Sequence, residues 1–192
     1  MIAEILILII SYLIGSIPSG FLIARLAGIA DIRAHGSGNI GATNVARVLG
    51  KHYFVLVFVA DMLKAYAWLT LLAHCGYATT VCLLAAGALL IGNGCSIFLR
   101  GSGGKGVATS FGILLTLNPP LLCCAALSWF FMLWYTKVVG IASVVILLIA
   151  PFCSWLFLHD DKPMVLFVFC MAAWGLFLHR NNIKGYLRLG DA

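Results

Sequence analysis

Long apolar stretches separated by short polar segments run along almost the whole chain. A helix needs about 20 apolar residues to cross a hydrocarbon core of about 30 Å. The stretches with this character are residues 2–24, 53–74, 79–99, 138–158 and the shorter 163–178. The pattern therefore predicts an all-α, polytopic integral membrane protein, in which residues 1–192 form a single transmembrane domain.

Residues 107–136 are too long for one upright helix, and Asn118-Pro119-Pro120 interrupts them. The residue before a proline is disfavoured in helical geometry, and each proline lacks a backbone donor. The segment is therefore either one kinked crossing or two short ones, 107–117 and 120–136. A helix of eleven residues is only about 17 Å long. Such short helices are tolerated at membrane depth where they line a protein-walled or watery cavity.

The distribution of Lys and Arg decides between six and seven crossings, because cytoplasmic loops carry an excess of both. Seven crossings place nearly all basic residues on the cytoplasmic face and leave only Lys162 outside. Six crossings would put the later basic residues opposite the earlier ones; these are Lys137, Arg180, Lys184 and Arg188. We therefore predict seven transmembrane helices, one broken or short near Pro119, with the N-terminus outside and the C-terminus cytoplasmic.

Composition agrees with a membrane protein, since 63% of residues are hydrophobic and 9% are charged, against roughly 25% charged in a soluble domain. A net charge of +6 would suggest nucleic acid as a partner of a soluble protein. Here the basic residues flank apolar stretches, so topology, anionic lipid and phosphate ligands explain them better, and no nucleic acid is expected. The seven cysteines show no CxxC spacing, and neither a disulfide framework nor a metal site is predicted from them.

The first polar segment, residues 34–47, is dense in glycine and short polar residues. Its polar side chains include Ser37, Asn39, Thr43, Asn44 and Arg47. Glycine permits positive φ and a close approach of the backbone to a ligand, and arginine can grip a phosphate with two parallel hydrogen bonds. An ordinary interhelical loop needs only a few such residues, so the segment indicates a phosphate site.

The second polar segment, residues 100–109, is a glycine-rich turn with Lys105 that runs into an apolar helix. Such a turn presents backbone N–H groups and the positive helix end to an anion. The nucleotide P-loop requires Ser or Thr directly after the lysine, and Gly106 stands there. Phosphate binding is therefore predicted, and nucleotide binding is not.

The third polar segment, residues 179–189, follows the last apolar stretch, where a basic tail is expected from topology alone. His179 at its start could accept a proton or bind phosphate, although a lone interfacial histidine is more often structural. Asp61 and Lys64 lie inside the second crossing on one helical face. A structural ion pair and a direct role both remain open for them.

Three motifs in these segments resemble those of the PlsY family, bacterial glycerol-3-phosphate acyltransferases that use acyl phosphate as the donor. The motifs are Ser37-Gly-Asn-Ile-Gly-Ala-Thr-Asn44 with Arg47, Gly103-Gly-Lys-Gly-Val-Ala-Thr109, and His179-Arg180 with Asn182-Ile183. The resemblance covers nearly the whole chain. It departs at Gly92-Asn93, where family members typically have a Gly-His pair.

The resemblance implies transfer of a fatty acyl group from acyl phosphate to the 1-hydroxyl of sn-glycerol 3-phosphate. The products would be 1-acyl-sn-glycerol 3-phosphate (lysophosphatidic acid) and phosphate, the first step of phospholipid synthesis. The expected location is the bacterial cytoplasmic (inner) membrane, with the active site on the cytoplasmic face among membrane lipid. No cofactor or metal is expected, and neither acyl-CoA nor acyl carrier protein is expected as the direct donor.

Resemblance and chemistry together predict roles for individual residues. The expected catalytic residues are Ser37, Lys105 and His179. The expected substrate-binding residues are Gly38, Asn39, Gly41, Thr43, Asn44, Arg47, Gly103, Gly104, Gly106, Thr109, Arg180 and Asn182. Either His179 or a bound phosphate would take the hydroxyl proton. Ser37 is expected to donate a hydrogen bond rather than to accept the acyl group, because no base is visibly paired with it.

Two other protein classes can be weighed against this prediction. One acyltransferase class carries His and Asp five residues apart, and no histidine of this chain is followed by Asp at that spacing. A transporter or flippase for an organic phosphate is the alternative that remains. Broken helices and an intramembrane Asp61 would suit it. The absence of an internal repeat and the placing of all phosphate-binding segments on one face argue against it.

Overall fold

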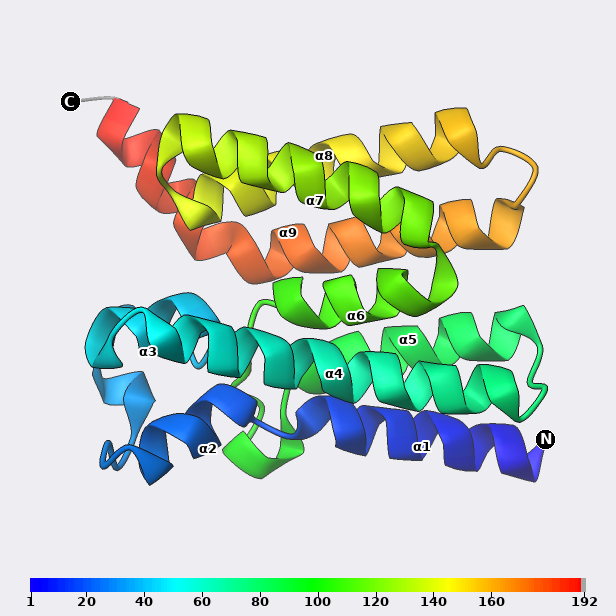
Figure 1. The fold of residues 1–192 in the computed structure, drawn as a ribbon, viewed down its shortest axis with the longest axis horizontal. Coiled ribbons are helices and arrows are strands. Elements are labelled where there is room, and N and C mark those ends of the chain that lie inside the picture. The colour runs from blue at the N-terminus through cyan, green and yellow to red at the C-terminus, as the bar shows by residue number, and fades with distance from the viewer. Residues whose placement is uncertain (191–192) are drawn as a thin grey trace. The chain divides into compact units, whose positions relative to one another are not determined.

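The computed structural model describes the backbone of residues 1–190 and the side chains of residues 1–186. Within this part the chain is all-helical, as predicted, and contains no strand (Figure 1). The helices are α1 (Ile2–Ser16), α2 (Ser19–Leu26), α3 (Ala42–Leu49), α4 (His52–His74), α5 (Thr79–Gly94), α6 (Val107–Leu117), α7 (Pro119–Thr136), α8 (Val139–Phe157) and α9 (Lys162–Gly190). Two short 3-10 helices, η1 (Ile32–Ala34) and η2 (Ile97–Leu99), lead into the first and second polar segments.

Six helical stretches are long and apolar enough to cross a membrane. They are Ile2–Leu26, His52–His74, Thr79–Leu99, Pro119–Thr136, Val139–Phe157 and Lys162–Tyr186. Helix α6 is apolar but has only 11 residues. The count of seven crossings and their orientation, which rested partly on Arg188, stay predictions; the side chain of Arg188 lies outside the described residues.

The interruption at Asn118 separates two helices rather than kinking one. Helix α6 ends at Leu117 and α7 begins at Pro119. The Asn118 side chain caps α7 by accepting a hydrogen bond from the Leu121 amide at 2.9 Å, and the prolines occupy the first turn, where a missing N–H does no harm. Of the two alternatives for residues 107–136, the structure therefore has the pair of helices.

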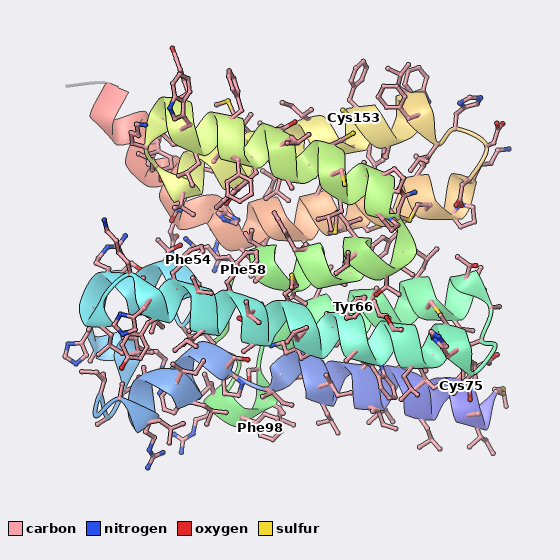
Figure 2. All side chains as sticks on the ribbon, in the orientation of Figure 1. Phe54, Phe58, Tyr66, Cys75, Phe98 and Cys153 are labelled. Atoms are coloured by element: carbon pink, nitrogen blue, oxygen red, sulfur yellow. The ribbon has the colours of Figure 1, made fainter. Side chains whose placement is uncertain are left out.

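The chain forms two compact units, residues 1–117 and 118–192. In the first unit α1 packs along α5, and α4 packs against α3 and α6 (Figure 1). In the second unit α8 packs against both α7 and α9. Large apolar side chains such as Phe98, which is 59% exposed, project outward from the helices (Figure 2). Such a surface fits contact with lipid. The expectation of one domain over residues 1–192 stays a prediction.

The first apolar stretch is broken in its interior, which the sequence analysis did not predict. Helix α1 ends at Ser16 and α2 begins at Ser19, with Pro18 between them. Proline has no N–H, and its ring clashes with the carbonyl four residues before it. Close packing supports this break: a Cβ added to Gly15 would collide with the Leu89 carbonyl, and one added to Gly92 with the Tyr12 carbonyl. Small residues thus let α1 and α5 approach closely.

An apolar cluster anchors the first polar segment to the membrane helices around it. Its buried members are Ala24, Ile32, Ile40, Val45, Val57 and Leu99. They come from α2, η1, α3, α4, η2 and the loop before α3. Burying such side chains contributes about 1.5–3 kcal/mol for each large one. The cluster therefore fixes the polar loop as firmly as the helices themselves.

Candidate active site

Asn44 is the centre of the first polar segment. Its side chain is almost fully buried. Its amide oxygen accepts from the Ser37 backbone N–H at 2.7 Å and from Arg47 Nη1 at 3.1 Å. Its Nδ2 donates to the backbone carbonyls of His35 at 3.0 Å and Asn39 at 2.8 Å. These four hydrogen bonds make Asn44 the residue that shapes the loop; its binding of substrate stays a prediction.

The neighbouring predicted residues remain closer to the surface. Ser37, Gly38 and Arg47 are exposed, and Asn39, Gly41 and Thr43 are half-buried. Asn39 closes a tight turn by accepting from the Gly41 amide at 2.8 Å. Gly38 has a positive φ of 73°, which an L side chain rarely adopts. The loop therefore presents Ser37 and Arg47 outward from a backbone that Asn44 holds in place.

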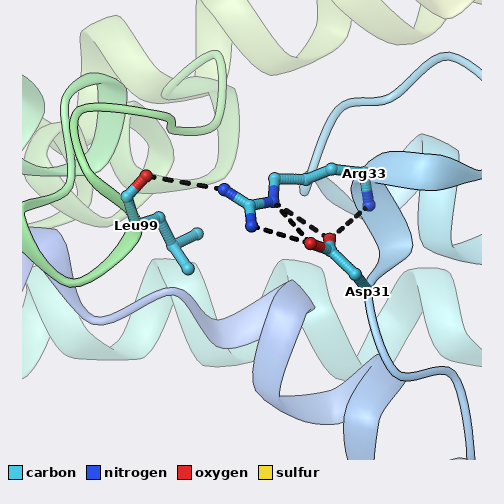
Figure 3. A network of polar contacts seen from close by, with 3 residues as sticks. All are labelled: Asp31, Arg33 and Leu99. Carbon is cyan, nitrogen blue, oxygen red and sulfur yellow. Dashed lines mark hydrogen bonds and ion pairs between the residues drawn. The ribbon is translucent and has the colours of Figure 1, made fainter.

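Arg33 links the chain just before the first polar segment to the chain just before the second (Figure 3). Arg33 pairs with Asp31, with Nη2 at 2.7 Å from one carboxylate oxygen and Nε at 3.0 Å from the other. Arg33 Nη1 then donates to the backbone carbonyl of Leu99 at 3.5 Å. The hydrogen bonds from Arg33 lower the pKa of Asp31 to about 2, so the carboxylate stays charged at neutral pH.

The second segment presses its backbone against the end of α5. The Gly104 amide donates to the Asn93 carbonyl at 2.8 Å. A Cβ on Gly103 would collide with the carbonyl oxygens of Asn93 and Gly94. Gly106 has a positive φ of 78° immediately before α6 begins. Glycine is thus required at Gly103 by close approach and at Gly106 by conformation, while the Gly104 amide holds the loop to α5.

Two predicted cations converge on this loop from different segments. Lys105 is half-buried. Burial lowers the pKa of its ammonium group, and the nearby positive charge of Arg47 lowers this pKa further. A loop that brings two like charges together at a partly desolvated place is stabilised by an anion between them. The first two motifs therefore bring their cations near one another within residues 1–117, and the binding of an anion there stays a prediction.

Thr109 follows the glycine loop in sequence and lies in the first turn of α6. Its side chain is fully buried, and its Oγ1 has no hydrogen-bond partner among residues 1–186. An unsatisfied buried hydroxyl costs about 1–3 kcal/mol, which is unusual in a well-packed unit. Thr109 therefore has hydrogen-bonding capacity that the described residues do not use, and its predicted binding role stays a prediction.

The third segment belongs to the second unit, where it continues α9 instead of following its end. His179 is buried, and its Nδ1 lies 2.8 Å from the Gly175 carbonyl. A carbonyl only accepts, so Nδ1 donates in this hydrogen bond, and a role of His179 as the base stays a prediction. Asn182 and Tyr186 follow on the same helical face, and both would meet a Cβ placed on Gly140 of α8.

Arg180 lies on a different face of α9 from His179. It is exposed, donates to the Phe177 carbonyl at 2.9 Å and places its guanidinium 4.2 Å from the centre of the Phe177 ring. This stacking pre-orients the guanidinium without neutralising its charge. A phosphate clamp at Arg180 stays a prediction.

The sequence analysis missed three residues that organise the site. Asp31 and Arg33 form the link to Leu99, and only their spacing of two residues could have suggested a local pair. Asn93 supports the glycine loop through its backbone, and the single available signal was that it departs from the Gly-His pair of the PlsY family. Asp61 and Lys64 form an ion pair, with 2.7 Å between Asp61 Oδ1 and Lys64 Nζ. The structural alternative for these two residues is therefore present, and a direct role for them stays a prediction.

Comparisons with known proteins agree with the motifs. Residues 5–189 match the model of a family described as glycerol-3-phosphate acyltransferase. The chain is 41% identical to the glycerol-3-phosphate acyltransferase of Desulforudis audaxviator, over 97% of this chain and 93% of that one. It is 40% identical to the enzyme of the same description from Bacillus velezensis, over 93% of this chain and 91% of the relative.

Solved structures give the same result for the fold. The crystal structure of PlsY (YgiH), an integral membrane glycerol 3-phosphate acyltransferase in its glycerol 3-phosphate form, matches with a TM-score of 0.86 and 34% identity, over 97% of this chain and 92% of that one. Its lysophosphatidic acid form matches with a TM-score of 0.85 and 33% identity, at the same coverage.

Proposed function

The chain belongs to the glycerol-3-phosphate acyltransferase family, and on this basis we propose that it acylates the 1-hydroxyl of glycerol 3-phosphate from a fatty acyl phosphate. It is an integral membrane acyltransferase. The products are 1-acyl-sn-glycerol 3-phosphate and inorganic phosphate. The glycerol 3-phosphate and lysophosphatidic acid forms of PlsY support this acceptor and this product.

The convergence of Lys105 and Arg47 is the observation that carries the proposal. Burial and the nearby positive charge of Arg47 raise the free energy of the charged form of Lys105, and a phosphate dianion bound beside it offsets this cost. Both substrates carry a phosphate under this proposal. More than one cationic, glycine-rich segment is therefore needed to hold two phosphates. A single such segment would be enough if the donor carried no phosphate.

The reaction needs positioning and charge stabilisation more than a special nucleophile. The hydroxyl oxygen of glycerol 3-phosphate bonds to the acyl carbon, and the bond from that carbon to the phosphate oxygen breaks. The leaving phosphate keeps the electron pair, and the hydroxyl proton passes to His179 Nε2 or to phosphate. Lys105 and Arg47 stabilise the charge that develops on the phosphate.

The other motif residues are assigned supporting roles in the same proposal. Ser37, Asn39, Thr43, Thr109 and Asn182 supply hydrogen bonds to substrate. Arg180 clamps a second phosphate, and the backbone of Gly38, Gly41, Gly103 and Gly106 allows the ligand to approach. Asn44 and Gly104 act through the loop conformation, because their hydrogen-bonding groups are engaged inside the protein. No step calls for a metal or a cofactor.

We place the enzyme in the bacterial cytoplasmic membrane with its site facing the cytoplasm, where soluble glycerol 3-phosphate is at hand. The acyl chain of the donor lies among apolar helix surfaces, while its phosphate reaches the polar loops. A membrane-embedded enzyme suits a donor that partitions into lipid by its own chain. Delivery by acyl-CoA or acyl carrier protein is therefore unnecessary.

Release of phosphate from palmitoyl phosphate by the purified protein in lipid vesicles tests the proposal. We expect release that depends on glycerol 3-phosphate and is matched mole for mole by acylated product. Palmitoyl-CoA and palmitoyl-acyl carrier protein should give no product. Product from either of these but not from palmitoyl phosphate would overturn the donor. Transport of labelled glycerol 3-phosphate across the bilayer without product would favour a transporter.

A further inference from the structure

Lys64 is a buried cation in the first unit, far from the polar loops in sequence. Its side chain is 9% exposed and is paired with Asp61 at 2.7 Å. It also donates to the backbone carbonyls of Gly15 at 3.1 Å and Ile17 at 2.9 Å. A further acceptor is the side-chain oxygen of Asn93, at 3.2 Å. Four acceptors thus surround one ammonium group.

The carbonyls of Gly15 and Ile17 explain why a cation stands at this depth. They belong to the break at Pro18, where backbone groups lose their helical partners. Unsatisfied carbonyls inside a membrane protein are costly, and broken helices persist only where other groups meet them. Lys64 therefore donates to two carbonyls at the break between α1 and α2, alongside the bond from Ser96 Oγ to the Ser16 carbonyl, while Asp61 compensates its charge.

Asn93 connects this break to the glycine loop. It is the penultimate residue of α5 and is 6% exposed. Its side chain faces Lys64, and its backbone carbonyl accepts the Gly104 N–H. Its Nδ2 lies 3.1 Å from the point that a Cβ on Gly104 would occupy. One residue thus contacts the intramembrane cation on one side and the segment bearing Lys105 on the other.

We propose that Asn93 is a positioning residue for acyl transfer: anchored by Lys64, it fixes the 103–106 loop and thereby the ammonium group of Lys105. The proposal rests on the acyltransferase function proposed above. The backbone hydrogen bond from Gly104 to Asn93 holds the loop against the end of α5. The side-chain hydrogen bond from Lys64 keeps that end of α5 from rotating. Loss of the side chain alone would leave the loop attached but less well aligned.

Asn93→Ala tests this, because it keeps the backbone carbonyl and removes the bond to Lys64 together with the side-chain contact at Gly104. Steady-state kinetics with palmitoyl phosphate and glycerol 3-phosphate should show kcat reduced about 10- to 100-fold. The KM for glycerol 3-phosphate should change by less than about threefold, as expected when an interaction acts in the transition state. Asn93→Asp retains an oxygen acceptor for Lys64 and should recover most of the lost kcat.

Ser11→Ala is the matched control, since it removes another buried hydrogen bond between α1 and α4. Ser11 is fully buried and accepts from Trp68 Nε1 at 2.7 Å. Its variant should lower the thermal midpoint at least as much as Asn93→Ala does, yet leave kcat within about twofold.

Three results would overturn the positioning role: wild-type kcat in Asn93→Ala, an equal kcat loss in Ser11→Ala, or no recovery in Asn93→Asp. A wild-type protein without acyltransferase activity would instead contradict the proposed function. Failure of the positioning role can therefore be distinguished from failure of the proposed function. If Asn93→Ala does not fold, the kcat of Asn93→Asp decides alone. A value within about threefold of wild type supports the proposal, and a tenfold loss contradicts it.

Discussion

Arg33 reaches from η1 to the backbone carbonyl of Leu99 at the end of η2, while Asp31 holds its guanidinium from the other side (Figure 3). The contact joins two segments 66 residues apart in the chain. Because those segments lead to Arg47 and Lys105, the geometry of the proposed anion site depends on a pair of residues outside either motif.

Arg33→Ala should lower kcat/KM about three- to tenfold, because the two loops lose a shared anchor and their cations become less well aligned. Arg33→Lys should restore the charge but not the fork that engages both Asp31 and Leu99, so it should recover little. The comparison needs only phosphate-release kinetics on purified variants. Full activity in Arg33→Ala would show that the apolar cluster alone holds the loops together.

The activity should fall at alkaline pH with an apparent pKa below the ordinary lysine value of 10.5. Burial and Arg47 both lower the pKa of Lys105, so its ammonium group loses its proton at lower pH than an exposed lysine does. Since the charged form binds phosphate, kcat/KM declines as pH rises through this pKa. A pH profile of kcat/KM measures this decline directly as its alkaline limb.

Two variants identify the titrating group in that profile. Lys105→Arg should remove the limb, because guanidinium stays protonated throughout. Arg47→Gln should lower overall activity and move the limb to higher pH, because the like charge is gone. An alkaline limb that persists unchanged in Lys105→Arg would assign it to another group.

Asn44→Ala should destabilise the first unit by about 2–4 kcal/mol, since four hydrogen bonds of a buried amide are lost at about 1 kcal/mol each. It should also abolish measurable turnover, because the Ser37 amide and Arg47 lose the oxygen that orients them. Asn39→Ala removes a single turn-closing bond and serves as the milder control. Thermal unfolding in detergent and phosphate release give the two readouts.

Gly103→Ala should destabilise the protein by about 1–3 kcal/mol, because the new methyl group meets backbone oxygens that cannot give way. The loop would have to leave α5, and activity should fall with it. Gly87→Ala is the control: this helical glycine of α5 has open space around its Cβ position. Alanine there should be neutral or stabilise by about 0.5–1 kcal/mol. Equal behaviour of the two variants would contradict the close packing at Gly103.

Most of the helices could be predicted from the sequence, because a helix that crosses lipid needs a long run of apolar residues and hydropathy detects such a run. The separation at Asn118 was also accessible, since paired prolines act locally whatever surrounds them. The break at Pro18 was missed for the opposite reason. The apolar pattern continues through it, and the donors that satisfy the carbonyls at the break include Lys64 and Ser96, which are distant in the sequence.

The candidate site divides in the same manner. Glycine density and basic residues drew attention to the first two polar segments, and the structure brings the charge of Arg47 near Lys105; their binding of phosphate stays a prediction. The hydrogen bonds within each segment could not be predicted from the sequence. Asn44 looks like a ligand-binding amide in the sequence, yet its groups bond to its own loop. Which polar groups face inward depends on backbone turns that composition does not encode.

The break at Pro18 has a consequence for the order in which the protein is assembled. The carbonyl of Gly15 leaves the ribosome 49 residues before Lys64, which donates to it in the folded protein. Until α4 enters the bilayer this carbonyl lacks that donor, so the nascent first span should be held less securely in lipid than its hydropathy indicates. Insertion of α4, which brings Lys64 to the break, should therefore stabilise the span that precedes it.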